Sequence, residues 1–82
     1  MSFQSAIAKA DAAKKSNKKL SNEQKLQLYA HYKQGSSGPC NIPKPGMFDL
    51  LATAKYNAWK ALGSMSQAAA QAKYIQLVNQ FC

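Results

Sequence analysis

The feature that most restricts how this chain can fold is a break in its middle, where half of the residues in segment 35–46 are glycine or proline. Proline fixes φ and lacks an amide hydrogen, and glycine favours turns, so neither a continuous helix nor a central strand suits this segment. A connection of this length in a compact domain usually crosses another element or carries function. The fold therefore has to be assembled from elements on either side of the break.

Four stretches without glycine or proline have the composition of helices. Ser21, followed by Gln24, has the pattern of a capping box, and Ser66 is placed to cap the last helix. Gly35 is expected to end the second helix and Gly63 the third. No stretch alternates as a strand would, so we predict an all-α four-helix bundle with one long connection between helices two and three. The predicted helices are 3–15, 22–34, 51–62 and 67–81.

The charge of the chain is one-sided, with 11 basic residues, all of them lysine, against 3 acidic ones and a net charge of +8. Such an excess predicts anionic partners. The absence of arginine argues against base-specific recognition of nucleic acid, for which a bidentate guanidinium is the usual group. Lysine suits phosphates and anionic membrane surfaces, so we expect ligands of that kind and no nucleic acid.

The length of the chain predicts a single domain, 1–82, which we expect to be a cytoplasmic monomer. It has neither the apolar segment of a secretory signal nor a run of about eighteen apolar residues. Cys40 and Cys82 are too few for a metal site or a disulfide framework, and we expect reduced thiols. The acidic residues are too far apart for paired-carboxylate catalysis, so we expect no enzyme activity, no metal and no cofactor.

One helix face carries an unusual set of side chains. Tyr29, Tyr32 and Lys33 are spaced i, i+3 and i+4, so they share a face of the predicted second helix. Phenol rings stack on flat rings, and an ammonium group attracts phosphate. This face predicts a nucleotide-like anionic ligand. Taken one by one, the tyrosines would more often be half-buried core residues and the lysine a solvated one.

Four separated motifs place this face in a wider pattern. They are Tyr29–Gln34 (YAHYKQ), Pro45–Met47 (PGM), Ala54–Trp59 (AKYNAW) and Ala72–Ile75 (AKYI). In this order and spacing they resemble the acyl-CoA-binding protein family, from about residue 20 to residue 81. The resemblance implies a four-helix bundle of that type with an overhand connection between helices two and three. It also implies binding and intracellular transport of medium- to long-chain fatty acyl-CoA esters, without chemistry.

The resemblance also assigns individual residues to the ligand. Tyr29, Lys33 and Lys55 match residues that engage the ribose 3′-phosphate. Tyr32 matches the ring that packs against adenine, and Tyr74 matches a further contact with the nucleotide end. These assignments place the predicted site on three different helices.

Four further positions extend the family pattern or depart from it. Lys14, in the first helix, matches a basic ligand contact. Leu51 stands where the family usually has a basic residue, so one phosphate contact is expected to be absent or moved. Tyr56 replaces a common tryptophan, and Lys25 replaces an apolar residue beside the acyl tunnel, where only its stem can line the wall. These differences predict changes in affinity and chain-length preference, not in ligand class.

Two other functions stay open at this level. Aromatic residues beside lysines are also typical of small nucleic-acid-binding proteins. The lysines of the first two helices could instead form a basic face that docks on anionic membranes.

His31 lies about 100° around the helix from its tyrosine neighbours, so we expect it exposed or at an edge, without a role as base or metal ligand. Trp59 and Leu62 are expected in the core.

Overall fold

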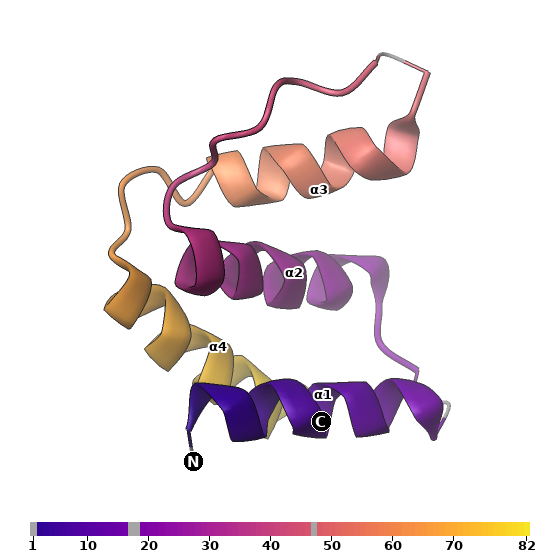
Figure 1. Cartoon of the computed structure of the whole chain (residues 1–82). Helices are drawn as coiled ribbons and strands as arrows, with labels where there is room; N and C mark the ends of the chain where they lie inside the picture. The colour runs from indigo at the N-terminus through magenta and orange to yellow at the C-terminus, as the bar shows by residue number, and fades with distance from the viewer. Residues whose placement is uncertain (1, 17–18, 47) are drawn as a thin grey trace.

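The computed structural model describes residues 2–16, 19–46 and 48–82, and the side chain of Lys14 lies outside this description. The described residues form helices and no strand (Figure 1). The helices are α1 (Phe3–Lys15), α2 (Asn22–Ser37), α3 (Leu50–Lys60) and α4 (Gln67–Phe81). The predicted all-α fold is confirmed. Within the described ranges, no helix has the length and apolar character that crossing a membrane requires.

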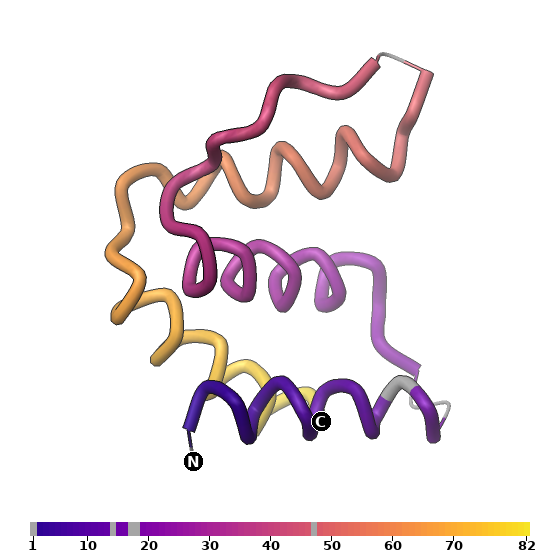
Figure 2. Tube along the Cα trace, in the orientation of Figure 1, coloured from indigo at the N-terminus to yellow at the C-terminus, as the bar shows by residue number. Residues whose placement is uncertain are grey.

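The long connection is explained by the direction of the helices it joins. The trace in Figure 2 leaves the end of α2, passes along α3 and enters α3 at its far end, so that α2 and α3 run in the same direction. The connection must therefore cover the length of α3, whose 11 residues rise by about 1.5 Å each. An extended chain spans about 3.3 Å per residue, so the 38–49 segment is long enough to do so.

Side-chain caps fix where three of the helices begin. The Ser21 hydroxyl accepts the Gln24 backbone N–H at 3.1 Å, and the Gln24 side chain accepts the Ser21 N–H at 2.9 Å. Ser66 and Asp49 each accept a backbone N–H three residues further on. The predicted capping box and the Ser66 cap are confirmed, and such caps each stabilise a helix by about 1 kcal/mol.

The packing places α2 between two neighbours. It contacts α3 on one side and α4 on the other, while α1 contacts α4 (Figure 1). The buried core lies between α1, α2 and α4 and consists of Ala6, Ala10, Leu28, Tyr74, Leu77 and Val78. Trp59 of α3 is 1% exposed, as expected, and its indole N–H donates to the Gly38 carbonyl at 3.0 Å. Leu62 is only half-buried.

Two helix ends differ from the prediction. α2 continues past Gly35 to Ser37, because Gly38, with φ of 84°, is the residue that ends it. Gly35 has a different reason to be glycine: a Cβ there would lie 2.9 Å from the Gln71 Cγ and 3.1 Å from the Phe3 Cζ. The close approach of α2 to α4 therefore requires it. α3 ends at Lys60, two residues earlier than predicted, and a turn follows.

The expectation for His31 was wrong, because its side chain is 8% exposed. Its Nδ1 lies 2.7 Å from the carbonyl oxygen of Gln27, one turn earlier in α2. The physical reason is that α2 packs on both α3 and α4, so in its middle, residues 26–35, only Tyr32 remains exposed.

No local pattern indicated the role of Gln34, which is fully buried. Its side-chain amide donates to the carbonyls of Gly63 and Met65, at 3.1 and 2.7 Å. One polar side chain of α2 thus holds the connection between α3 and α4 against the middle of the bundle.

Replacing this amide should destabilise the fold. Gln34→Ala removes two hydrogen bonds and leaves two carbonyls to find other partners, so we expect the free energy of unfolding to fall by about 2–4 kcal/mol. Urea denaturation followed by circular dichroism measures it. Gln80→Ala, on an exposed position of α4, is the matched control and should change stability by less than about 0.5 kcal/mol. Equal stability of the two variants would contradict this role of Gln34.

Candidate ligand-binding cleft

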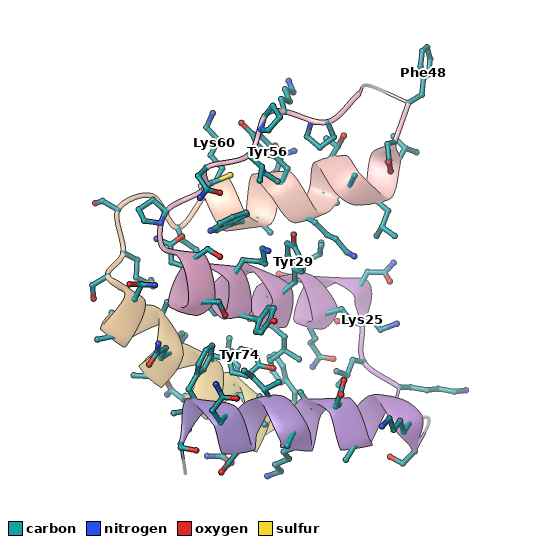
Figure 3. All side chains as sticks on the ribbon, viewed as in Figure 1. Lys25, Tyr29, Phe48, Tyr56, Lys60 and Tyr74 are labelled. Carbon is teal, nitrogen blue, oxygen red and sulfur yellow. The ribbon has the colours of Figure 1, made fainter. Side chains whose placement is uncertain are left out.

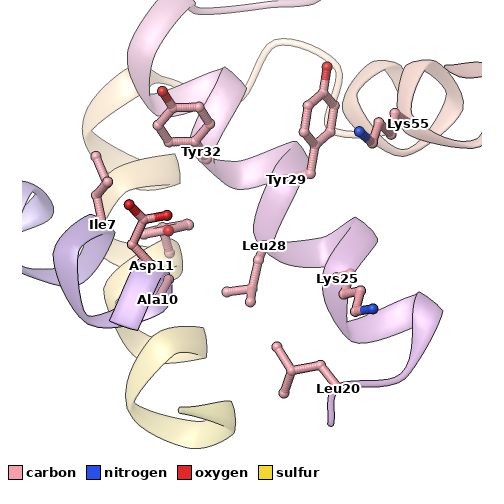
Figure 4. A pocket seen from close by; sticks show the side chains of 10 residues that line it. Ile7, Ala10, Asp11, Leu20, Lys25, Leu28, Tyr29, Tyr32 and Lys55 are labelled. Atoms are coloured by element: carbon pink, nitrogen blue, oxygen red, sulfur yellow. The ribbon is translucent and has the colours of Figure 1, made fainter. Parts of the chain in front are cut away.

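A cavity of about 490 Å³ lies where α1 and α2 face each other across α4. In the described part of the chain, both helices pack along α4, whereas α1 meets α2 through the ring of Phe3, which lies against Tyr32 and Gly35. Beyond this contact a space remains between the two helices. Four of the predicted site residues line it: Tyr29, Tyr32, Lys55 and Tyr74 (Figure 4). The other lining residues are Ile7, Ala10, Asp11, Leu20, Lys25 and Leu28.

Three aromatic rings cluster at one side of the cavity, and two of them, Tyr32 and Tyr74, line it. Tyr74 is 4% exposed and meets the ring of Phe3 edge-on, with 5.3 Å between centroids. Tyr32 lies 6.2 Å from Tyr74 and 6.3 Å from Phe3, and it is 37% exposed. Tyr32 therefore has a ring available for stacking on a planar ligand, whereas Tyr74 supports it from behind.

Burial also determines the state of the Tyr74 phenol. Removal of the group from water raises the pKa of Tyr74 to about 12, because the phenolate loses its hydration. The phenol is thus neutral at physiological pH. It can present a hydroxyl to the ligand but no negative charge.

A lysine from α3 completes the opposite wall. The Lys55 Nζ lies 5.2 Å from the centroid of the Tyr29 ring, which comes from α2 (Figure 4). This is the geometry of a cation–π contact, whose energy is about 0.5–1 kcal/mol at an exposed site. A phosphate at this point would meet an ammonium and a phenol hydroxyl together.

One predicted site residue, Lys33, does not line the cavity. The Lys33 Nζ lies 5.3 Å from the centroid of the Trp59 ring, on the side of α2 that faces α3. The side chain of Lys14 lies outside the described residues, so its predicted contact stays a prediction.

A second hollow, of about 600 Å³, lies between α2 and α3 beside the first. Lys25 and Lys55 line both hollows. The remaining lining residues of the second are mostly apolar: Asn22, Leu26, Leu50, Leu51 and Ala54. We call this second hollow the apolar groove. A cavity with tyrosine, charged and apolar side chains in its lining thus adjoins an apolar groove at two shared lysines.

Sequence reasoning missed one charged lining residue, Asp11, together with the apolar residues Ile7, Ala10, Leu20 and Leu28. The only signal available for Asp11 was its position four residues after Ile7, which puts both on one face of α1. Its carboxylate repels an anion from the α1 side of the cavity (Figure 4). The attractive part for an anionic group is therefore the Tyr29–Lys55 side.

The arrangement suits an amphipathic anion with a planar ring. Tyr32 offers stacking, Lys55 offers a charge for phosphate, and the apolar groove offers cover for a hydrocarbon chain. Within the described ranges, no cluster of three or more His, Cys, Asp or Glu side chains could hold a metal ion.

Comparison with known proteins identifies the relatives of this chain. A family model described as Acyl CoA binding protein matches residues 1–78. The Acyl-CoA-binding protein of Dictyostelium discoideum is 48% identical over 71 residues, which are 87% of this chain and 84% of that protein. The crystal structure of Oryza sativa Acyl-CoA-Binding Protein 2 has a TM-score of 0.82 and 40% identity, and the match covers 96% of this chain and 89% of that one. These findings confirm the resemblance and the type of bundle.

Some relatives are much longer proteins. Human Enoyl-CoA delta isomerase 2 is 59% identical over 58 residues, which are 71% of this chain but 15% of that protein. The isomerase activity in that name belongs to the relative. Nothing in the match shows that this chain is an enzyme.

The buried Tyr74 phenol should make the free energy of unfolding fall as the pH rises through the alkaline range. In the unfolded chain this phenol ionises near pH 10, whereas in the folded chain its pKa is about 12. The contribution to stability is full below about pH 10 and is lost as the pH rises to about 12. Tyr74→Phe, which cannot ionise, should lose less unfolding free energy over this range than the original chain. Urea denaturation at several pH values tests this, and parallel pH profiles would contradict it.

Proposed function

The chain belongs to the acyl-CoA-binding protein family, and we propose that it binds medium- to long-chain fatty acyl-CoA esters and carries or stores them in the cytoplasm unchanged. The observation that supports this best is the meeting of Tyr29, Tyr32 and Lys55 in one cavity beside the apolar groove. We further propose that 1–82 acts as one monomeric, non-catalytic binding domain.

The nucleotide end of the ligand would occupy the cavity. Lys55 and the Tyr29 hydroxyl would bind the 3′-phosphate, and Tyr32 would stack on adenine with Tyr74 behind it. Lys33 would leave the Trp59 ring and turn toward the same phosphate, one helical turn after Tyr29. The contact it gives up is weak, about 0.5–1 kcal/mol, and a charge-assisted hydrogen bond exceeds it.

The acyl chain would lie in the apolar groove between α2 and α3. Burial contributes about 0.8 kcal/mol per methylene, so six covered methylenes would contribute about 5 kcal/mol. Leu26, Leu51 and Ala54 offer the apolar cover, and the stem of Lys25 extends it while its ammonium reaches water.

This division explains why both parts of the ligand are needed. A free fatty acid would fill the groove without satisfying Lys55, and free CoA would satisfy the lysine without covering the groove. The full ester gains both contributions, but it loses translational and rotational freedom only once. We therefore expect the acyl-CoA ester to bind more tightly than either half.

Removing the cavity lysine tests the assignment. Lys55→Ala should weaken binding of dodecanoyl-CoA by about tenfold to a hundredfold, because a hydrogen bond to a charged group contributes about 1.5–3 kcal/mol. Isothermal titration calorimetry measures it. The matched control is Lys73→Ala on α4, which removes the same charge from an exposed residue that lines neither hollow. If both variants bind like the original chain, the proposed site is wrong.

Leu51 offers a test in the opposite direction. It is 65% exposed beside Lys55, where the family usually has a basic residue. Leu51→Lys keeps part of the apolar cover through the lysine stem and places an ammonium beside Lys55. It should add a phosphate contact and tighten dodecanoyl-CoA binding about three- to tenfold at low salt, and less at high salt.

The control for this substitution is Ala61→Lys, an exposed position after the other end of α3. It adds the same charge away from both hollows and should leave affinity within about twofold. A gain of affinity that is equal in the two variants would reflect net charge alone and would contradict a local role for position 51.

A further inference from the structure

Three large apolar side chains at the start of α3 face water. Phe48 is 93% exposed, Leu50 79% and Leu51 65%. We call these three residues the apolar edge. Figure 3 shows Phe48 projecting away from the bundle beside the start of α3. The other exposed large apolar side chains of the described residues, Tyr32 and Ile42, are 37% and 42% exposed, so the apolar edge is distinct.

The backbone holds the apolar edge in place. Asp49 lies between Phe48 and Leu50, and its carboxylate caps α3 by accepting the Ala52 N–H at 3.0 Å. The Asp49 N–H donates to the Gly46 carbonyl at 3.0 Å. The exposure of these side chains is therefore a property of the helix start, not of a frayed chain end.

The side of the molecule that carries the apolar edge is positively charged. The end of α1, the start of α2 and the start of α3 lie at one end of the molecule in Figure 1. Exposed Lys15, Lys19 and Lys25 belong to this end, against Glu23 and Asp49. The carboxylate of Asp49 is already engaged by the helix, and Lys25 lines the apolar groove together with Leu50 and Leu51.

We propose that the apolar edge docks this protein on an anionic membrane, with Phe48 in the interfacial layer and the lysines of the same end on lipid phosphates. Exposed aromatic and aliphatic side chains flanked by lysine are the combination that binds at the lipid interface. Each lysine near an anionic surface adds attraction that salt weakens. The net charge of +8 steers the whole chain toward such a surface.

Docking in this way would also affect the path of the ligand. This consequence rests on the proposed function. Leu50 and Leu51 belong both to the apolar edge and to the apolar groove. The groove would then open at the membrane, and an acyl chain could pass between groove and bilayer without crossing water.

Sedimentation with vesicles tests the docking itself. The full chain is mixed with phosphatidylcholine vesicles that contain either no phosphatidylserine or about one third of it. We expect binding to the anionic vesicles only, and a roughly tenfold loss of partitioning in Phe48→Ser. Ile42→Ser, the same kind of change at an exposed apolar residue elsewhere in the 38–49 connection, should stay within about twofold of the original chain.

Phe48→Trp directly reports how deeply the side chain at position 48 enters the lipid bilayer. Its added fluorescence should be quenched by brominated phospholipid in anionic vesicles, while Trp59 is buried at 1% exposure and should contribute little change. The same vesicles should leave the fluorescence of Ile42→Trp unquenched.

Three results would overturn the proposal. They are equal vesicle binding by Phe48→Ser and the original chain, absence of quenching in Phe48→Trp, and concentration-dependent dimers that Phe48→Ser abolishes, which would make the edge a self-association face. Phe48 lines neither hollow, so dodecanoyl-CoA affinity in solution should be unchanged in Phe48→Ser. Failure of docking and failure of the proposed function are therefore distinguishable.

Discussion

The structure depends on α2 being held from both sides. Hydrogen bonds secure it on both sides. The Gln34 amide donates to the carbonyls of Gly63 and Met65, and the Trp59 indole donates to the Gly38 carbonyl. From α4, the amides of Gln67 and Gln71 donate to the carbonyls of Ser36 and Gly35. Because α2 and α3 run in the same direction, their contact cannot be closed by a tight turn, and these bonds fix the connections instead. Tyr29 and Tyr32 are about 60° apart on α2, so one meets Lys55 of α3 and the other meets Tyr74 of α4.

Local signals predicted the helices well. Ser21, Gln24 and Ser66 act within one turn, so a single sequence contains all the information they need. Errors arose where distant contacts decide. Gly35 resembles a helix stop, but it allows α4 to approach, and Gly38 ends the helix. His31 resembles an exposed residue until two neighbours of α2 cover it.

The candidate site was predicted in part for the same reason. Tyr29, Tyr32, Lys55 and Tyr74 line one cavity because helix spacing and family motifs fix where their backbones lie. The position of a flexible lysine head group depends on the nearest attractive partner. For Lys33 that partner is the Trp59 ring, and for Lys55 it is the Tyr29 ring. The Lys55 ammonium is thereby held at the cavity, which lowers the rotamer entropy that a ligand contact would otherwise cost.

The cavity exists because two helices share a support and meet each other only in part. α1 and α2 both pack along α4, and the Phe3 ring of α1 reaches Tyr32 and Gly35 of α2. A domain of this size has little apolar surface to spare for a longer contact between them. Small residues such as Ala6 and Ala10 let α1 lie close to α4, and the side of α1 with Ile7 and Asp11 faces the space toward Tyr32. A ligand in this space would supply the packing that α1 and α2 do not give each other. Its binding free energy would then add to the stability of the folded state, because the unfolded chain has no such cleft.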